Sequence, residues 1–186
     1  AYNRLIGAAP DKIAINADQK INTSNHTYNR GSVSFLNSLT QPHTSSSSDV
    51  FSIEVSTLDI ELARADSCRL IKADVEGAEA LVLAGGTAVI NRLRPILYLE
   101  CGQERLYDQL SPILRTLNYK PFWHAALHYN PNNFFRCNNL TGPFGDMNIL
   151  CIPAEEHVSE SLLSNFKLYP CGRWNQIAEL YPEFRY

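Results

Sequence analysis

The order of strand-like and helix-like segments predicts an α/β protein with a mainly parallel sheet that ends in an antiparallel strand pair. Three observations lead to this prediction. Short, nearly continuous apolar runs stand at 68–75 and 94–101, as is typical of strands covered on both faces in a parallel sheet. Each run is followed by apolar residues at helical spacing. Two further strand-like segments, 119–125 and 146–154, follow one another with no helical pattern between them.

The length and composition are those of one soluble globular domain, residues 1–186. The chain has 186 residues, of which 45% are hydrophobic and 19% charged, enough to bury a core. The net charge of −3 and the scattered basic residues argue against nucleic acid or a membrane surface as partner. We find no secretory signal and no apolar stretch of the roughly 18 residues that suggest a membrane span. We therefore expect a cytoplasmic protein.

The cysteines predict neither a disulfide framework nor a metal centre. Their number is odd, they lie far apart, and no Cys-x-x-Cys pair occurs among Cys68, Cys101, Cys137, Cys151 and Cys171. We expect reduced thiols that are mostly buried.

The N-terminal third contains two predicted strands joined by polar loops. Residues 11–19 and 50–59 alternate apolar and polar side chains, which predicts half-buried strands. The connection at 41–50 holds a proline and four consecutive serines, a composition typical of surface loops. A short helix or turn is expected at 60–68.

The remaining helices follow from apolar spacing. Segment 78–93 predicts two short helices joined by a break at the Gly85-Gly86 pair. Leucines and an isoleucine share one helical face over 106–117, where Pro112 is expected to start a new turn or to kink the helix. Near the end of the chain, 159–168 predicts a weak helix. The structure of 154–186 as a whole, a C-terminal extension, is not predicted.

Acidic residues stand where the apolar runs end. Asp74 and Glu76 follow the first run, and Glu100 closes the second. Ligands of open α/β sheets bind beyond the carboxyl ends of the strands, and the helix that begins near Gly77 adds backbone N–H groups and the positive end of its dipole. The structural alternative is a helix cap or first-turn charge, stabilising by about 1 kcal/mol. We favour that alternative most for Glu79, less for Glu76, and least for Asp74, because an unpaired carboxylate inside an apolar run is costly.

Five stretches of the chain carry a resemblance to a known family. They are "TLD" at 57–59, "LIKADVEGAEALVLAGG" at 70–86, "RPILYLE" at 94–100, "NPNNFF" at 130–135 and "MNILCIP" at 147–153. Together they resemble the FkbM family of S-adenosylmethionine-dependent methyltransferases, over roughly residues 5 to 153 and most closely between 57 and 100. The whole run with its spacing is specific, whereas "DVEG" alone is not.

The resemblance implies a Rossmann-like class I methyltransferase sheet that binds S-adenosylmethionine and moves its methyl group, usually to a hydroxyl oxygen of a sugar or small molecule. It implies that Asp74 and Glu76 are catalytic, with a carboxylate helping to remove the hydroxyl proton. Asp74, Val75, Glu76 and Gly77 are then also cofactor contacts, and Glu100 is a substrate contact. We expect a small-molecule or carbohydrate acceptor and no metal, although a cation near Asp74 and Glu76 that polarises the hydroxyl stays an open minority option.

One departure from the family pattern is large. Methyltransferases of this type carry a glycine-rich turn after the first strand and an acid after the second, both upstream of "TLD". Gly7 is followed by no glycine cluster, and no strand with a following acid precedes residue 57 at suitable spacing. We therefore expect a partial domain, the C-terminal portion lacking its first strands, that binds S-adenosylmethionine poorly or not at all.

Two substrate contacts are predicted further along. His124 and His128 are four residues apart, a spacing that suits a metal only on a helix, so we assign His124 to the substrate rim. The loop around Asn133 combines amide and aromatic side chains suited to a sugar, and we assign Asn133 to the substrate as well. A plain surface connection is the alternative for this loop.

Two rival functions stay open. One is a non-catalytic α/β binding module that has lost the cofactor site, and the other is a sugar-modifying transferase of another class, such as a glycosyltransferase. A Gly-x-Ser-x-Gly nucleophile motif and a phosphate-binding loop are both missing from the sequence, so hydrolases and nucleoside triphosphatases have no support.

Overall fold

The structure, a computed structural model, describes residues 4–16, 50–140 and 142–184. Most of the predicted connection at 41–50 lies outside these ranges, as do residues 17–19 of the first predicted strand. The chain divides into two compact units. Unit 1 comprises residues 1–67 and 74–93, and unit 2 comprises residues 68–73 and 94–186. Each unit is described by itself.

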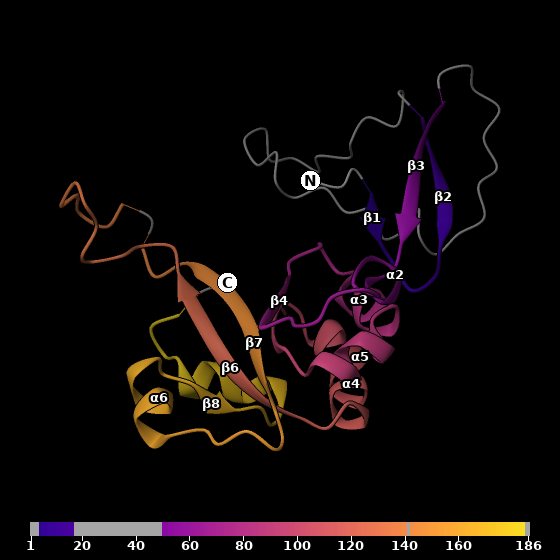
Figure 1. The fold of residues 1–186 in the computed structure, drawn as a ribbon. Coiled ribbons are helices and arrows are strands. Elements are labelled where there is room, and N and C mark those ends of the chain that lie inside the picture. The colour runs from indigo at the N-terminus through magenta and orange to yellow at the C-terminus, as the bar shows by residue number, and fades with distance from the viewer. Residues whose placement is uncertain (1–3, 17–49, 141, 185–186) are drawn as a thin grey trace. The chain divides into compact units, whose positions relative to one another are not determined.

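The described part of unit 1 has a three-stranded sheet and three short helices. The sheet, in the order β1-β3-β2, consists of β1 (Leu5–Ile6), β2 (Asp11–Asn16) and β3 (Val50–Ser56). Strand β3 pairs in parallel with β1 and antiparallel with β2, and β2 and β3 form the longer pair in Figure 1. The helices are α2 (Leu58–Glu61), α3 (Glu79–Ala84) and α4 (Thr87–Leu93). The predicted break between two helices at Gly85-Gly86 is confirmed.

Close backbone packing explains the glycine at the break. A Cβ atom at Gly85 would run into the carbonyl oxygen of Gly7 and would lie 3.2 Å from the Cβ of Thr57. A Cβ at Gly86 would lie 2.8 Å from the Cδ1 of Leu58. The glycine pair therefore ends α3 and also lets the start of α2 and the segment after β1 approach it.

Unit 2 is built on a five-stranded sheet in the order β4-β5-β7-β6-β8. Its strands are β4 (Leu70–Ala73), β5 (Ile96–Glu100), β6 (Tyr119–Leu127), β7 (Gly145–Pro153) and β8 (Tyr169–Pro170). Strands β4 and β5 pair in parallel, whereas β7 pairs antiparallel with both β5 and β6, and β8 pairs antiparallel with β6. Figure 1 shows β6 and β7 as the two long strands of this sheet.

Helix α5 packs on one face of this sheet. The helix spans Glu104–Thr116 and buries Leu106, Leu110 and Leu114. Its Tyr107 ring lies 4.7 Å, centroid to centroid, from the ring of the fully buried Trp123 in β6. Leu99 of β5 and Ile149 of β7 are register partners on this same face, because Ile149 also pairs with Trp123. Helix α5 continues through Pro112, which stands on the exposed side, so no new helix begins there, and the kink stays a prediction.

The opposite face of the sheet carries a second core with helix α6 (Glu160–Asn165). Phe122, Ile152 and Leu168 are buried in this core. The partly buried hydrophobic residues packed against them are Leu150, Val158, Leu162 and Leu163. Ser159 begins α6 with a side-chain oxygen that accepts a hydrogen bond from the Leu162 N–H, an N-cap that stabilises by about 1 kcal/mol.

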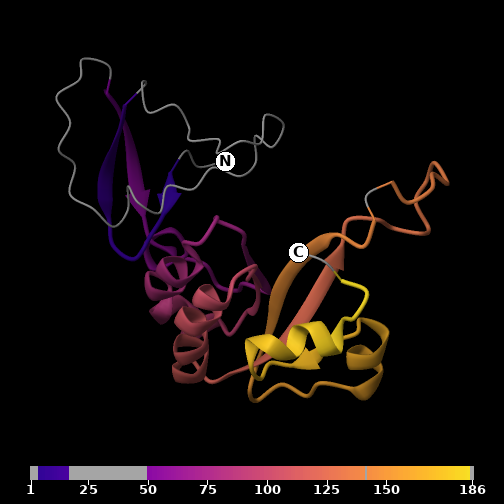
Figure 2. The same cartoon turned by 180° about the vertical axis from the view of Figure 1, so that it is seen from behind.

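The C-terminal residues are part of unit 2. After α6 come β8, the 3₁₀ helix η1 (Trp174–Gln176) and α7 (Ile177–Leu180). The hydroxyl oxygen of Tyr181 lies 2.8 Å from the carbonyl oxygen of Trp123 and 2.6 Å from that of Lys167. Figure 2 shows the helical part of this yellow segment across the lower part of the long strands of unit 2. The region whose structure the sequence did not predict thus completes the sheet and covers its core.

The α/β class is confirmed, and so is the antiparallel pairing of the last two long strands. The mainly parallel arrangement is not confirmed, because only β4 and β5 pair in parallel and the other strand pairs of this sheet are antiparallel. Strand β4 also differs from the doubly covered strand that its apolar run suggested. Its burial alternates, with Leu70 56% exposed and Ile71 8% exposed.

Candidate functional site

The loop between β4 and α3, residues 74–78, is the segment that the family motif singles out. Glu76 has a φ of 54° and Gly77 a φ of 96°, a left-handed conformation that glycine adopts readily and glutamate seldom. A non-glycine residue in this region costs on the order of 1 kcal/mol and persists only when its surroundings hold it there. The loop therefore needs an internal anchor.

Glu79, the first residue of α3, is that anchor. Its Oε1 accepts hydrogen bonds from the backbone N–H of Val75 at 2.9 Å and, more weakly, of Gly77 at 3.5 Å. The residue N-terminal to the helix, Ala78, makes no side-chain cap, so the Glu79 carboxylate takes over part of that role from inside the helix. These two bonds hold the backbone on either side of the left-handed Glu76.

The electrostatic state of Glu79 is unusual for a helix-start acid. The residue is 0% exposed, and its Oε2 has no hydrogen-bond partner among the described residues. Burial raises the pKa of its carboxyl above the ordinary value, and the charge of Asp74 adds to that rise, while the backbone N–H donors oppose it. The structural role that the sequence predicted for Glu79 therefore fits. The residue is buried, however, and is not the solvated first-turn charge that was expected.

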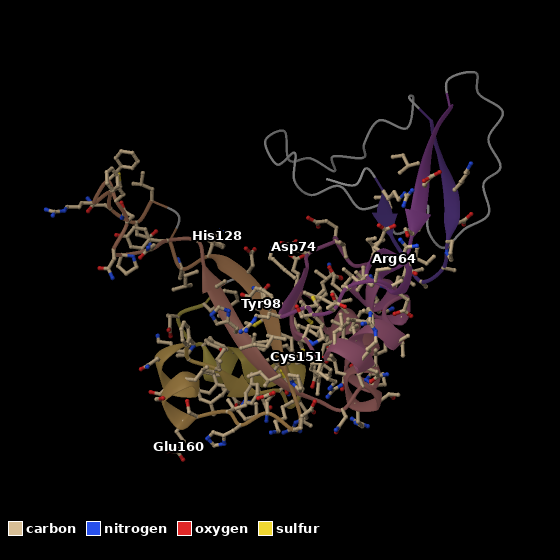
Figure 3. The ribbon with its side chains drawn as sticks, viewed as in Figure 1. Arg64, Asp74, Tyr98, His128, Cys151 and Glu160 are labelled. Carbon is tan, nitrogen blue, oxygen red and sulfur yellow. The ribbon has the colours of Figure 1, made fainter. Side chains whose placement is uncertain are left out.

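The predicted catalytic acids lie on this loop. Asp74 is exposed and directly follows β4, as Figure 3 shows, and Glu76 is half-buried. Both make interactions of their own. Their carboxylate oxygens are ligands that Mg²⁺ or Ca²⁺ takes, but exposed acids alone do not define a metal site. The expectation of no metal therefore stays the prediction, and a cation stays the minority option. The roles of Asp74, Val75, Glu76 and Gly77 as catalytic or cofactor residues stay predictions as well.

Glu100 is the last residue of β5, as the sequence predicted. The parallel register pairs Ala73 of β4 with Leu99 of β5, so both strands end at the same edge of the sheet. Glu100 is half-buried, and its register partner across the antiparallel pair is Asn148 of β7. Its substrate contact stays a prediction.

The "TLD" stretch has a structural role that the sequence did not reveal. Thr57 caps α2 through its Oγ1, which accepts a hydrogen bond from the Ile60 N–H at 3.2 Å. Asp59 caps α4 instead of its own helix, since its Oδ1 and Oδ2 accept from the N–H groups of Val89 at 2.7 Å and Ala88 at 3.2 Å. The two partners are about thirty residues away in sequence, and no local signal could have indicated the contact.

His124 lines an apolar cavity. The cavity has a volume of about 230 Å³ and is lined by Tyr98, His124, Leu150, Leu162, Phe166 and Leu168. The Tyr98 hydroxyl lies 2.7 Å from the His124 Nδ1, and burial lowers the pKa of the imidazole. Tyr98, labelled in Figure 3, was not singled out from the sequence, because the two residues are 26 positions apart.

Asn133 holds the β6–β7 loop together. Its Nδ2 donates to the carbonyl oxygens of Asn130 at 3.1 Å and Cys137 at 3.0 Å, and its Oδ1 accepts from the Cys137 N–H at 2.9 Å. Both amide donors are therefore used within the loop. A substrate contact through Asn133 stays a prediction that would have to use the second lone pair of Oδ1 or displace one of these bonds.

The comparisons with known proteins agree with the motif. The family model described as the methyltransferase FkbM domain matches residues 2–125. No curated protein and no solved structure matches the chain. Across the described ranges, we find no helix with the length and apolar character needed to cross a membrane. Of the predicted site residues, Asn133 alone lies beyond the matched segment.

Proposed function

Because the chain belongs to the FkbM methyltransferase family, we propose that it is an S-adenosylmethionine-dependent methyltransferase that acts on a hydroxyl oxygen of a sugar or small natural product. The observation that carries the proposal is the anchored loop 74–78. It stands at the carboxyl end of a sheet strand, inside the segment that the family model matches, and ligands of α/β sheets bind at such ends.

The strand directions of unit 2 support a Rossmann-like methyltransferase sheet. Strands β4 and β5 are parallel, and β6 runs the same way because β7 is antiparallel to both β5 and β6. Three of the five strands thus share one direction, and β7 and β8 run the opposite way. This arrangement fits a sheet that is mainly parallel in strand direction although only one of its strand pairs is parallel.

The proposed chemistry places carboxylates beside an acceptor hydroxyl. Asp74 is exposed and is our candidate for the group that accepts the hydroxyl proton, a step that typically contributes 10²- to 10⁴-fold in rate. Glu76 is the second candidate. The fixed backbone of the loop would hold the acceptor in a reactive position, and such positioning supplies a large share of the rate in group transfer.

The fit of the cofactor to the described residues is incomplete. S-adenosylmethionine, when bound, supplies a methyl group on a positively charged sulfur. The loop offers backbone N–H groups, but those of Val75 and Gly77 already bond to Glu79. The sequence has no glycine-rich turn ahead of residue 57. We therefore derive no step through the cofactor, and we propose that this 186-residue chain binds it weakly by itself.

A methyl-transfer assay tests the proposal. The protein would be tested on hydroxylated sugars and natural-product cores, and the wild type compared with Asp74→Asn and Glu76→Gln. We expect Asp74→Asn to lower turnover by roughly 10²- to 10⁴-fold. Asp66→Asn, at an exposed aspartate of the same unit, is the matched control and should leave turnover unchanged. Unchanged turnover in both loop variants would remove these acids from the mechanism.

One rival function has a structural observation in its favour. The Val75 and Gly77 N–H groups of the loop at 74–78 already donate to the carboxylate of Glu79. This use of the loop fits a non-catalytic module that retains the motif for stability. Absence of methyl transfer on every acceptor, together with absence of cofactor binding, would favour this module. Nothing in the described residues favours a glycosyltransferase over these two functions.

A further inference from the structure

We propose that the loop between β6 and β7 binds an anionic lipid bilayer by inserting the phenyl rings of Phe134 and Phe135 into its headgroup region. The part of the loop that does so, residues 129–140, is called the tip. The tip lies within unit 2 and among the described residues. This interaction goes beyond methyl transfer and does not depend on it.

The tip exposes the least covered apolar side chains of the described residues. Leu140 is 92% exposed, Phe134 91% and Phe135 81%, whereas the next most exposed large hydrophobic side chain, Phe166, is 62% exposed. The rings of Phe134 and Phe135 meet edge to face with 5.2 Å between their centroids. They therefore form one apolar feature, and such features mark contacts with a membrane or with another protein.

The shape and size of the tip favour a lipid surface over a protein partner. Figures 1 and 2 show the loop after β6 projecting beyond the ends of β6 and β7. A stable protein interface buries about 800 Å² on each partner, whereas two phenylalanine side chains supply at most roughly 150–250 Å² each. A fluid bilayer needs neither a matching pocket nor such an area, and aromatic rings are common at its interface.

Hydrogen bonds within the tip satisfy its backbone, as entry into a bilayer requires. The Asn133 side chain bonds to the carbonyl oxygens of Asn130 and Cys137 and accepts from the Cys137 N–H. The Arg136 N–H donates to the Asn133 carbonyl at 3.0 Å, and the Tyr129 hydroxyl donates to the Cys137 carbonyl at 3.1 Å. Unpaired backbone groups are costly away from water, so these bonds let the neighbouring rings leave water at a lower cost.

The charge of the tip favours anionic lipid. Between residues 129 and 145 the sequence has one arginine, Arg136, and no carboxylate, although the whole chain has a net charge of −3. Anionic headgroups attract a basic residue at the bilayer surface, and no acid of the loop opposes this attraction. The scattered basic residues of the whole chain argued against a membrane surface, but this loop differs because its arginine directly follows two exposed rings.

Cosedimentation of the chain with lipid vesicles tests the proposal. We expect binding to vesicles of phosphatidylcholine and phosphatidylserine in equal parts, and weaker binding to phosphatidylcholine alone. Phe134→Ser combined with Phe135→Ser should weaken binding to the mixed vesicles at least roughly tenfold, because the burial of both rings is lost. Arg136→Gln should weaken that binding roughly fivefold and should leave binding to phosphatidylcholine unchanged.

Two control variants change exposed residues of the same unit outside the tip. Phe166→Ser removes another exposed ring, and Arg105→Gln removes an exposed arginine of α5. Both should bind the mixed vesicles as the wild type does. A further variant, Phe134→Trp, reports insertion directly, because brominated lipids should quench the fluorescence of an indole that enters the bilayer.

Four outcomes would overturn the proposal. The first two are a wild type that stays in solution with the mixed vesicles and a double serine variant that binds them as the wild type does. The third is an equal loss of binding in the control variants or an unquenched Phe134→Trp. The fourth is a wild type that is dimeric without lipid while the double serine variant is monomeric, because the tip would then be a contact between copies of the chain.

Discussion

Replacing Glu79 by alanine should loosen the loop at 74–78 without unfolding the sheet of unit 2. The substitution removes the acceptor of the Val75 N–H, which lies 2.9 Å from Oε1, and the weaker one of the Gly77 N–H. A part-buried donor left without its partner costs about 1–3 kcal/mol. The loop also loses the contact that holds Glu76 at a φ of 54°, so relaxation of that residue should offset part of the cost.

Amide hydrogen exchange measures this effect where it occurs. A local loss of about 1–3 kcal/mol corresponds to exchange at the Val75 amide that is roughly 5- to 150-fold faster, since each 1.4 kcal/mol is a factor of ten. Glu104→Ala is the matched control, because Glu104 is also the first residue of a helix but is exposed. Wild-type exchange rates at Val75 and Gly77 in Glu79→Ala would refute the anchoring role.

The isosteric Glu79→Gln separates shape from charge. Burial raises the pKa of Glu79 above its ordinary 4.5, so the folded chain holds this proton more tightly than the unfolded chain. The resulting stability is fully present below pH 4.5 and is lost as the pH rises through the folded-state pKa. Gln cannot ionise, so the variant does not lose this stability. Its free energy of unfolding should therefore increase relative to that of the wild type as the pH rises above 4.5. A difference that is constant with pH would contradict the raised pKa.

Three further predictions follow from contacts within single units. Asp59→Ala should cost about 0.5–2 kcal/mol as a lost helix cap and should speed exchange at the Val89 amide, and Asp59→Asn should restore most of the protection. Glu155→Gln should destabilise the chain at pH 7 but not near pH 2 in urea unfolding. A hydrogen bond from Arg94 lowers the pKa of Glu155 from 4.5 to about 2, so the stabilisation is lost as the pH falls from 4.5 to about 2. Gly85→Ala should lower the melting temperature, since its Cβ would meet the carbonyl of Gly7 and such overpacking costs roughly 1–3 kcal/mol. An unchanged melting temperature there would show that the backbone shifts freely.

Local sequence patterns predicted the helices and strands of this fold, but they could not predict the long-range contacts between them. The break at Gly85-Gly86 and the antiparallel pairing of β6 with β7 follow from a dipeptide and from the missing helix between two strands. The insertion of β7 between β5 and β6 depends on tertiary packing of the whole sheet, which no single segment encodes. Pro112 was expected to disturb α5, yet it stands on the exposed side of a helix that is held by three buried leucines.

The same limit explains what was found and missed at the candidate site. Position after a strand identified Asp74 and Glu100, because strand ends can be read from apolar runs. Position gave no sign that Glu79 is buried, since an acid in the first turn of a helix is ordinarily solvated. Nor could it pair Tyr98 with His124, because that hydrogen bond exists only once β7 has placed β5 and β6 in one sheet.

The acids of the family motif therefore divide by what their carboxylates contact, and the division has a measurable consequence. Asp59 and Glu79 accept backbone N–H groups of α4 and of the loop, so their substitution should lower stability first and any turnover only through the loosened backbone. Such losses should be recovered at lower temperature or by Asn and Gln, which keep an acceptor oxygen. Asp74 is exposed on the loop that Glu79 holds. If it accepts a proton, Asp74→Asn should lower turnover far more than any change in stability explains, and cooling should not recover it.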